Sequence, residues 1–108
     1  MKIGTLRNAV EVQKVEEVQD ELGQPVEIWK TLHTVWASIS PITGREILDA
    51  GAERSDITAR IVIRWFDGLN TKHRIKFGER IFDIKVVIDD KERTRQYNLM
   101  CKEHTSGD

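Results

Sequence analysis

The sequence predicts a mainly β protein: a small antiparallel barrel of about six strands, with a short helix-containing insertion between strands two and three. Apolar and polar residues alternate along several short stretches, most clearly over residues 57–66, which is typical of strands with one buried face. Glycine, proline and aspartate separate these stretches, as expected of turns. Six strands that close on themselves leave no exposed edge, so a barrel is favoured over an open sheet.

The first half of the chain supplies two strands. Residues 8–13 alternate loosely and predict the first strand, and the polar, acidic residues 14–24 are expected to form a turn region. A β-prone run then begins at Val26, with the second strand placed at residues 31–40. Pro41 should end it, because proline lacks the N–H that a strand ladder needs.

An excursion over residues 41–56 follows. Thr43 is a suitable helix N-cap, and Glu46 three residues later could complete a capping box. Gly51 weakens this helix, so we expect two turns or fewer.

The second half supplies the other four strands. Residues 57–66 should present Ile57, Ala59, Ile61, Ile63 and Trp65 to the core and leave the opposite face mostly solvated. Turn residues then separate strands at 73–77, 80–88 and 93–103. We expect one domain over residues 1–104 and a flexible tail at 105–108.

Composition narrows the class of protein. At 108 residues, with 39% hydrophobic and 32% charged residues, the chain can bury one core. It contains no apolar run of the roughly 18 residues that a membrane helix needs, and its first residues lack a signal-peptide pattern. We therefore expect synthesis in the cytoplasm. The lone Cys101 cannot form an internal disulfide and fits a small buried residue.

The charge is small overall but unevenly distributed. The net charge is −1, so no global field attracts nucleic acid. A basic strand face for subunit or DNA contact is predicted from Arg60, Arg64, Arg74 and Lys76, which we expect on paired strands. An acidic flank for subunit contact comprises Glu11, Glu16, Glu17, Asp20 and Glu21. Two ordinary solvated faces are the simpler interpretation; head-to-tail pairing between copies is the alternative.

No catalytic, cofactor or metal site is predicted. His33, His73 and His104 are too widely spaced for a typical zinc motif. The chain has no glycine-rich phosphate loop, and Ser38 and Ser40 lie outside any nucleophile-elbow motif. An enzyme is therefore the least favoured class.

Several blocks of sequence, in order, resemble the tailed-bacteriophage head-closure family, also called head–tail adaptor, joining or stopper proteins. The most characteristic is Val35-Trp36-Ala37-Ser38-Ile39-Ser40-Pro41 followed by Gly44-Arg45-Glu46. The others are Ile3 to Arg7, Asp20 to Trp29, Ile61 to Arg64, Gly78 to Ile84 and Leu99 to Glu103. One departure is Asn8-Ala9, where relatives often carry a basic pair.

The resemblance implies a structural virion protein that forms a ring, commonly of twelve copies, in the head–tail connector. Such a ring closes the capsid exit after DNA packaging and offers a docking surface to the tail. The implied partners are copies of itself, the portal and adaptor proteins, a tail terminator or tail-completion protein, and packaged double-stranded DNA held non-specifically.

The resemblance also implies that the excursion faces the channel or a neighbouring subunit. Its candidate contact residues are Pro41, Ile42, Thr43, Gly44, Arg45, Glu46, Asp49, Glu53 and Arg54. The main alternative function is a nucleic-acid-binding barrel of OB or SH3-like type, although aromatic residues, which such surfaces use for stacking, are only 6% of the chain. A different virion or secretion-machine ring adaptor is a third possibility.

Overall fold

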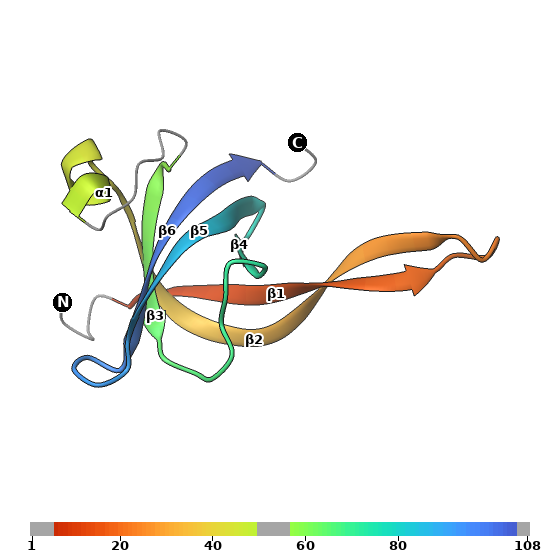
Figure 1. Ribbon diagram of the computed structural model, residues 1–108, viewed down its shortest axis with the longest axis horizontal. Helices are drawn as coiled ribbons and strands as arrows, with labels where there is room; N and C mark the ends of the chain where they lie inside the picture. The colour runs from red at the N-terminus through yellow and green to blue at the C-terminus, as the bar shows by residue number, and fades with distance from the viewer. Residues whose placement is uncertain (1–5, 50–56, 106–108) are drawn as a thin grey trace.

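Six antiparallel strands close into a barrel, and one hairpin projects from it (Figure 1). The computed structural model describes residues 6–49 and 57–105. The order around the barrel is β1-β2-β3-β6-β5-β4. The strands are β1 (Asn8–Gln19), β2 (Pro25–Pro41), β3 (Ala59–Arg64), β4 (Arg74–Phe77), β5 (Arg80–Asp90) and β6 (Gln96–Thr105), with the helix α1 (Gly44–Asp49) after β2. The predicted fold class is confirmed.

Most of the residues that alternation assigned to the barrel interior fill it, but Ile57 precedes β3 and packs in a separate apolar cluster, and Trp65 is only partly buried. Ile61 and Ile63 of β3, Leu99 of β6 and Phe82 of β5 are completely buried. These β-branched and aromatic side chains suit a pleated surface with one dry face. Tyr97 is buried with them, and its hydroxyl donates a hydrogen bond to the Phe66 carbonyl.

The outer face of the β3–β6–β5 wall is less solvated than predicted. Val62 is only 4% exposed although it lies on the face of β3 that alternation assigned to water. Next to it a second apolar cluster forms outside the barrel around Ile47 of α1, Ile57 and Met100, with Ile42, Val86 and Ile88 against it. The short helix is therefore packed onto the barrel wall by its one buried apolar side chain.

The first two strands extend well beyond the predicted limits. β1 continues to Gln19 and β2 begins at Pro25, so residues 14–24 are not a turn region but the outer part of a long hairpin. Only residues 20–24 turn the chain. The Asp20 carboxylate accepts hydrogen bonds from the amides of Leu22 and Gln24, both at 2.9 Å, and Gly23 takes the positive φ of 78° that favours glycine.

The projecting hairpin gives the protein an elongated shape of 48 × 27 × 23 Å. At the other end of the chain, Thr105 is the last residue of β6 and pairs with Arg80, although we expected it in the tail. No helix in the described part of the chain is long and apolar enough to cross a membrane.

Candidate functional site

The hairpin formed by residues 14–31, here called the arm, is the most conspicuous exposed feature. Every residue from 21 to 34 is exposed, and Leu22 at the tip is 84% exposed. Large apolar side chains do not usually gather in water without a partner. The exposed apolar residues of the arm and its base are Leu22, Val26, Ile28, Trp29, Leu32 and Trp36.

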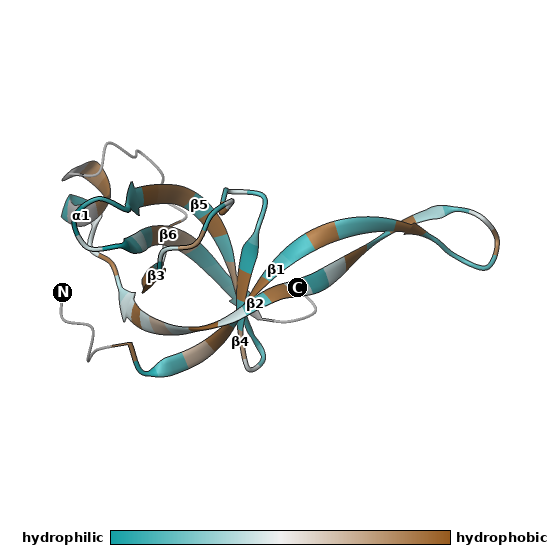
Figure 2. Cartoon of the chain, turned by 90° about the horizontal axis from the view of Figure 1, so that it is seen from below, coloured by the Kyte–Doolittle hydropathy of each residue, from teal (hydrophilic) through white to brown (hydrophobic). Residues whose placement is uncertain are grey.

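The two faces of the arm carry different side chains. The register pairs Val15 with Trp29 and Glu17 with Glu27 on one face. On the other face Lys14 pairs with Lys30, Glu16 with Ile28, and Val18 with Val26. Figure 2 shows apolar and polar residues alternating along both strands. Each face of the arm therefore carries both apolar and charged side chains, and neither face is wholly apolar.

A polar network fixes the arm where it leaves the barrel. A bulge between Val12 and Gln13 shifts the register there, and Gln13 is only 6% exposed. Its side-chain oxygen accepts a hydrogen bond from Arg74 Nε at 2.8 Å, and its amide lies 3.5 Å from the Thr31 hydroxyl. The Arg74 guanidinium lies 4.1 Å from the centre of the Trp29 ring. Burial lowers the pKa of Arg74, while Asp83 acts in the opposite direction.

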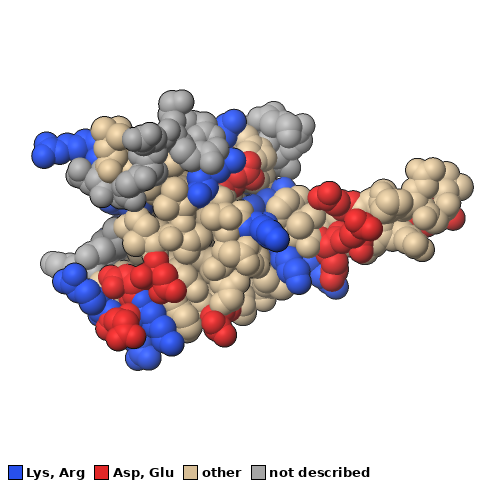
Figure 3. All heavy atoms as spheres, viewed as in Figure 1, with Lys and Arg blue, Asp and Glu red and all other residues tan. Residues whose placement is uncertain are grey.

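The predicted acidic flank lies along the arm. Glu11, at its base, accepts a hydrogen bond from Thr31 at 2.6 Å, and Glu16 pairs with Lys30 at 3.3 Å. Asp20 holds the turn, as described above. Glu17 and Glu21 are exposed, and neither has a cationic partner among the described residues. Figure 3 shows acidic side chains grouped on the arm, with basic ones beside them near the barrel.

The four residues of the predicted basic face do not form one face. β3 pairs with β2 and β6, whereas β4 pairs with β1 and β5, so Arg60 and Arg64 lie on the opposite side of the barrel from Arg74 and Lys76. The prediction assumed that consecutive strands pair, but β6 and β5 lie between them. Lys76 is also opposite Glu11 in the ladder. A continuous basic track of the kind that follows a phosphate backbone is therefore absent from these four positions.

The excursion is described only in its first part. Pro41 pairs with Ala59 as the last residue of β2, and Ile42 packs in the outer apolar cluster. Thr43, Gly44 and Arg45 are exposed, as is Leu48. Glu46 and Asp49 lie in α1. The predicted contact residues Glu53 and Arg54 lie outside the described residues.

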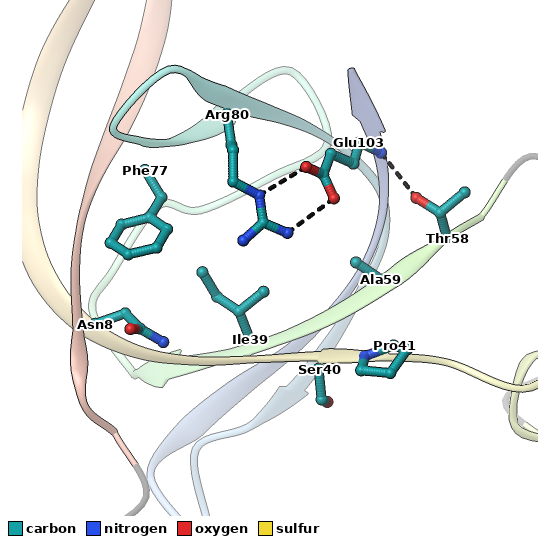
Figure 4. A pocket seen from close by; sticks show the side chains of 9 residues that line it. All are labelled: Asn8, Ile39, Ser40, Pro41, Thr58, Ala59, Phe77, Arg80 and Glu103. Carbon is teal, nitrogen blue, oxygen red and sulfur yellow. Dashed lines mark hydrogen bonds and ion pairs between the residues drawn. The ribbon is translucent and has the colours of Figure 1, made fainter. Parts of the chain in front are cut away.

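One end of the barrel is hollowed into a pocket of about 260 Å³. Asn8, Ile39 and Phe77 line it, and Arg80 and Glu103 lie across it (Figure 4). Arg80 donates two hydrogen bonds to the Glu103 carboxylate, at 2.6 and 2.9 Å. These bonds lower the pKa of Glu103 and raise that of Arg80. This bidentate pair links β5 to β6 at the pocket.

The surroundings of Cys101, His73 and His104 suit structural roles. Burial raises the pKa of Cys101 to about 12, so its thiol is inert at neutral pH. His73 lies in a turn and contacts Asn70, and His104 lies 3.2 Å from Asp83. Within residues 6–49 and 57–105 no group of three metal-ligating side chains comes together.

The sequence interpretation did not predict the arm. Its signal was the β-prone run from Val26, which was assigned to a strand only from residue 31. The acidic residues and the low apolar content of 14–24 suggested a loop, because a strand exposed on both faces shows no clear hydrophobic alternation.

The chain is similar in sequence to a family of phage proteins. The family model described as phage head completion protein matches residues 1–104. The head completion protein gp7 of Enterobacteria phage HK97 is 37% identical over 76 residues, which are 70% of this chain and 68% of that protein.

Two solved structures have a similar fold. The solution structure of protein SF1141 from Shigella flexneri 2a aligns with a TM-score of 0.75 and 31% identity, covering 95% of this chain and 96% of the other. A chain from the virion of a native gene transfer agent particle aligns with a TM-score of 0.63 and 19% identity, covering 94% and 97%.

Proposed function

The chain belongs to the phage head completion protein family, and from this premise we propose that it forms a ring that closes the capsid exit after DNA packaging. The family is structural and not enzymatic, and its members are virion components of the head–tail junction. The proposed ring of about twelve copies lies in the head–tail connector, binds the portal or adaptor proteins on one side and offers the other to a tail terminator or tail-completion protein. Packaged double-stranded DNA lies in its channel without sequence-specific contacts.

The observation that carries this proposal is the arm. A barrel of this size has no fold requirement for a hairpin whose residues 21–34 are all exposed. Ring subunits, by contrast, need surfaces that are free in the monomer and covered in the assembly. The exposed acidic residues Glu17 and Glu21 and the apolar Leu22 give the arm both components of such an interface.

We assign the excursion, residues 41–56, to the channel or to a neighbouring subunit. Ile47 and Ile42 attach its first part to the barrel wall, so the exposed Arg45 and Leu48 lie beside that wall. Movement of this segment, if the ring opens and closes, requires the outer apolar cluster to separate.

The alternative function, nucleic-acid binding by a small barrel, is less well supported, because the four basic residues are divided between opposite sides of the barrel. Arg74, which would be central to a DNA track, is instead held between Gln13 and Trp29.

The test is cosedimentation of the purified chain with DNA-filled, tailless heads that lack it, followed by cryo-electron microscopy of the portal vertex. We expect a ring at the vertex with the excursion toward the lumen. Failure to bind the vertex, together with steeply salt-dependent binding to free DNA, would favour the nucleic-acid barrel instead.

A pair of variants tests the arm in the same assay. Leu22→Ser removes an apolar side chain that is 84% exposed at the arm tip. If the contact buries it, binding should weaken about tenfold, since burying a leucine is worth ~1.5 kcal/mol or more. Arg93→Ser, also exposed but in the β5–β6 turn, is the matched control and should bind like the wild type. Equal binding by both variants would argue against an arm contact.

A further inference from the structure

The arm has two outer edges that are not paired within the chain. β1 pairs with β4 only over residues 11–13, and β2 pairs with β3 only over 37–41. Beyond these positions each strand pairs with the other alone, leaving the outer edges at 14–19 and 25–36 open (Figure 1). Unpaired backbone groups along an edge are a template for another strand.

The hairpin ladder shows which backbone groups face outward. The Asp20 amide donates to the Gln24 carbonyl at 2.9 Å, so this is a hydrogen-bonded pair. In an antiparallel ladder such pairs alternate with pairs whose N–H and C=O groups point away. The register is regular from Gln13 to the turn. Val15, Glu17 and Gln19 of β1, and Glu27 and Trp29 of β2, therefore direct their backbone groups to the free edges.

Two cross-strand pairs within the arm bring like charges together. Lys14 lies directly opposite Lys30, and Glu17 directly opposite Glu27. Like charges in directly opposite positions are destabilising. Lys30 reaches diagonally to Glu16 at 3.3 Å, whereas Glu17 and Glu27 have no cationic partner among the described residues.

We propose that the β1 edge of the arm pairs with the β2 edge of the arm of a second copy, in a register shifted by two residues. The shift places Glu16 opposite Lys30 of the second copy and Val18 opposite Ile28. It also places Trp29 of the second copy beside Glu17, and Gln19 beside Glu27 of the second copy, so the contact between copies adds no second Glu17–Glu27 opposition to the one within each arm. A shift of two residues keeps every side chain on its own face and matches outward backbone groups with outward backbone groups.

This inference rests on the proposed ring. In a head-to-tail ring all arms point the same way, so β1 of one copy and β2 of the next run in opposite directions, as antiparallel pairing requires. Each copy offers one edge of each kind, so the contacts repeat around the ring and no arm edge is left open. The arms then form one continuous belt of strands.

Disulfide trapping tests the register. An equal mixture of Val18→Cys chains and Ile28→Cys chains is bound to DNA-filled, tailless heads, mildly oxidised and run on a non-reducing gel. We expect covalent dimers from the mixture and at least fivefold fewer from either variant alone. Cys101 does not compete because it is buried. A mixture of Val18→Cys and Val26→Cys chains is the register control. These two positions lie opposite each other within one arm. In the shifted register between copies they are not opposite each other, so this mixture should give few dimers.

The outcomes separate the two proposals. If the cysteine variants sediment with the heads but the first mixture gives no more dimers than the single variants, the arm pairing is wrong and the ring is unaffected. If the wild-type chain does not sediment with the heads at all, the proposed function is wrong, and the inference falls with it.

A backbone variant provides an independent measurement. Proline at position 17 removes an N–H that points to the free edge, so the internal hairpin bonds survive while the contact between copies loses a donor. Glu17→Ala removes the same carboxylate but keeps the N–H. We expect Glu17→Pro to occupy the vertex at least tenfold less than Glu17→Ala at the same concentration. Equal occupancy would overturn the edge pairing.

Discussion

Replacing Gln13 with alanine should destabilise the protein and loosen the arm. The substitution removes the acceptor for Arg74 Nε, which lies 2.8 Å from the Gln13 oxygen. Hydrogen bonds to charged groups contribute ~1.5–3 kcal/mol, and a bond as long as the 3.5 Å contact with Thr31 adds little. Because Gln13 is only 6% exposed, water does not simply replace it. We expect a loss of about 2 kcal/mol in the free energy of unfolding.

Urea unfolding measures this loss, and hydrogen exchange locates it. With a slope of ~1–2 kcal/mol per molar urea, the midpoint should fall by about 1–2 M. Amides of residues 14–31 should exchange faster than the global destabilisation alone explains. Gln19→Ala is the matched control, since Gln19 is the same residue type in the same strand but exposed, and it should change stability by less than ~0.5 kcal/mol. If the two variants unfold alike, the network at the arm's base does not hold the arm.

Three further predictions concern other parts of the molecule. Ile47→Ala should lower the free energy of opening α1 from the barrel wall by about 2 kcal/mol, because it removes the buried side chain by which α1 packs in the outer apolar cluster. Hydrogen exchange should become faster in the helix, while barrel amides stay protected. Arg80 lowers the pKa of Glu103 below its ordinary 4.5, so the pair stabilises the fold above that pH and the contribution is lost as the pH falls through the lowered value; acid titration of Glu103→Gln should lack this part of the transition. Because burial raises the pKa of Cys101 to about 12, maleimide at pH 7 should label this thiol only after denaturation, and labelling of the native protein would contradict its burial.

The barrel was predictable because its residues alternate between a dry face and a wetter one. Ile61, Ile63 and Leu99 could be placed inside from spacing alone, and all are fully buried. The outer cluster was not predictable in the same way, because Met100 and Val62 occupy positions that alternation assigns to solvent. Their burial depends on neighbours distant in the sequence.

Strand order limited the prediction of the candidate site. Arg64 and Arg74 are close in sequence, and a simple hairpin would have placed them together. The closed order β3-β6-β5-β4 separates them, because the last two strands insert between the third and fourth. The alternation of apolar and polar residues predicts which face of a strand a residue occupies, but it does not predict which strand is the neighbour.

The length of the arm amplifies any change in the orientation of the barrel. About six residues of each strand extend past Gln13, a distance of ~20 Å at ~3.3 Å per residue, and the hydrogen bond from Arg74 to the buried Gln13 ties their base to the barrel. A barrel that turns by about 10° therefore moves the arm tip by roughly 3 Å, about the length of one hydrogen bond. In the proposed ring, a small change in how the barrel is seated is then enough to make or break a contact at Leu22.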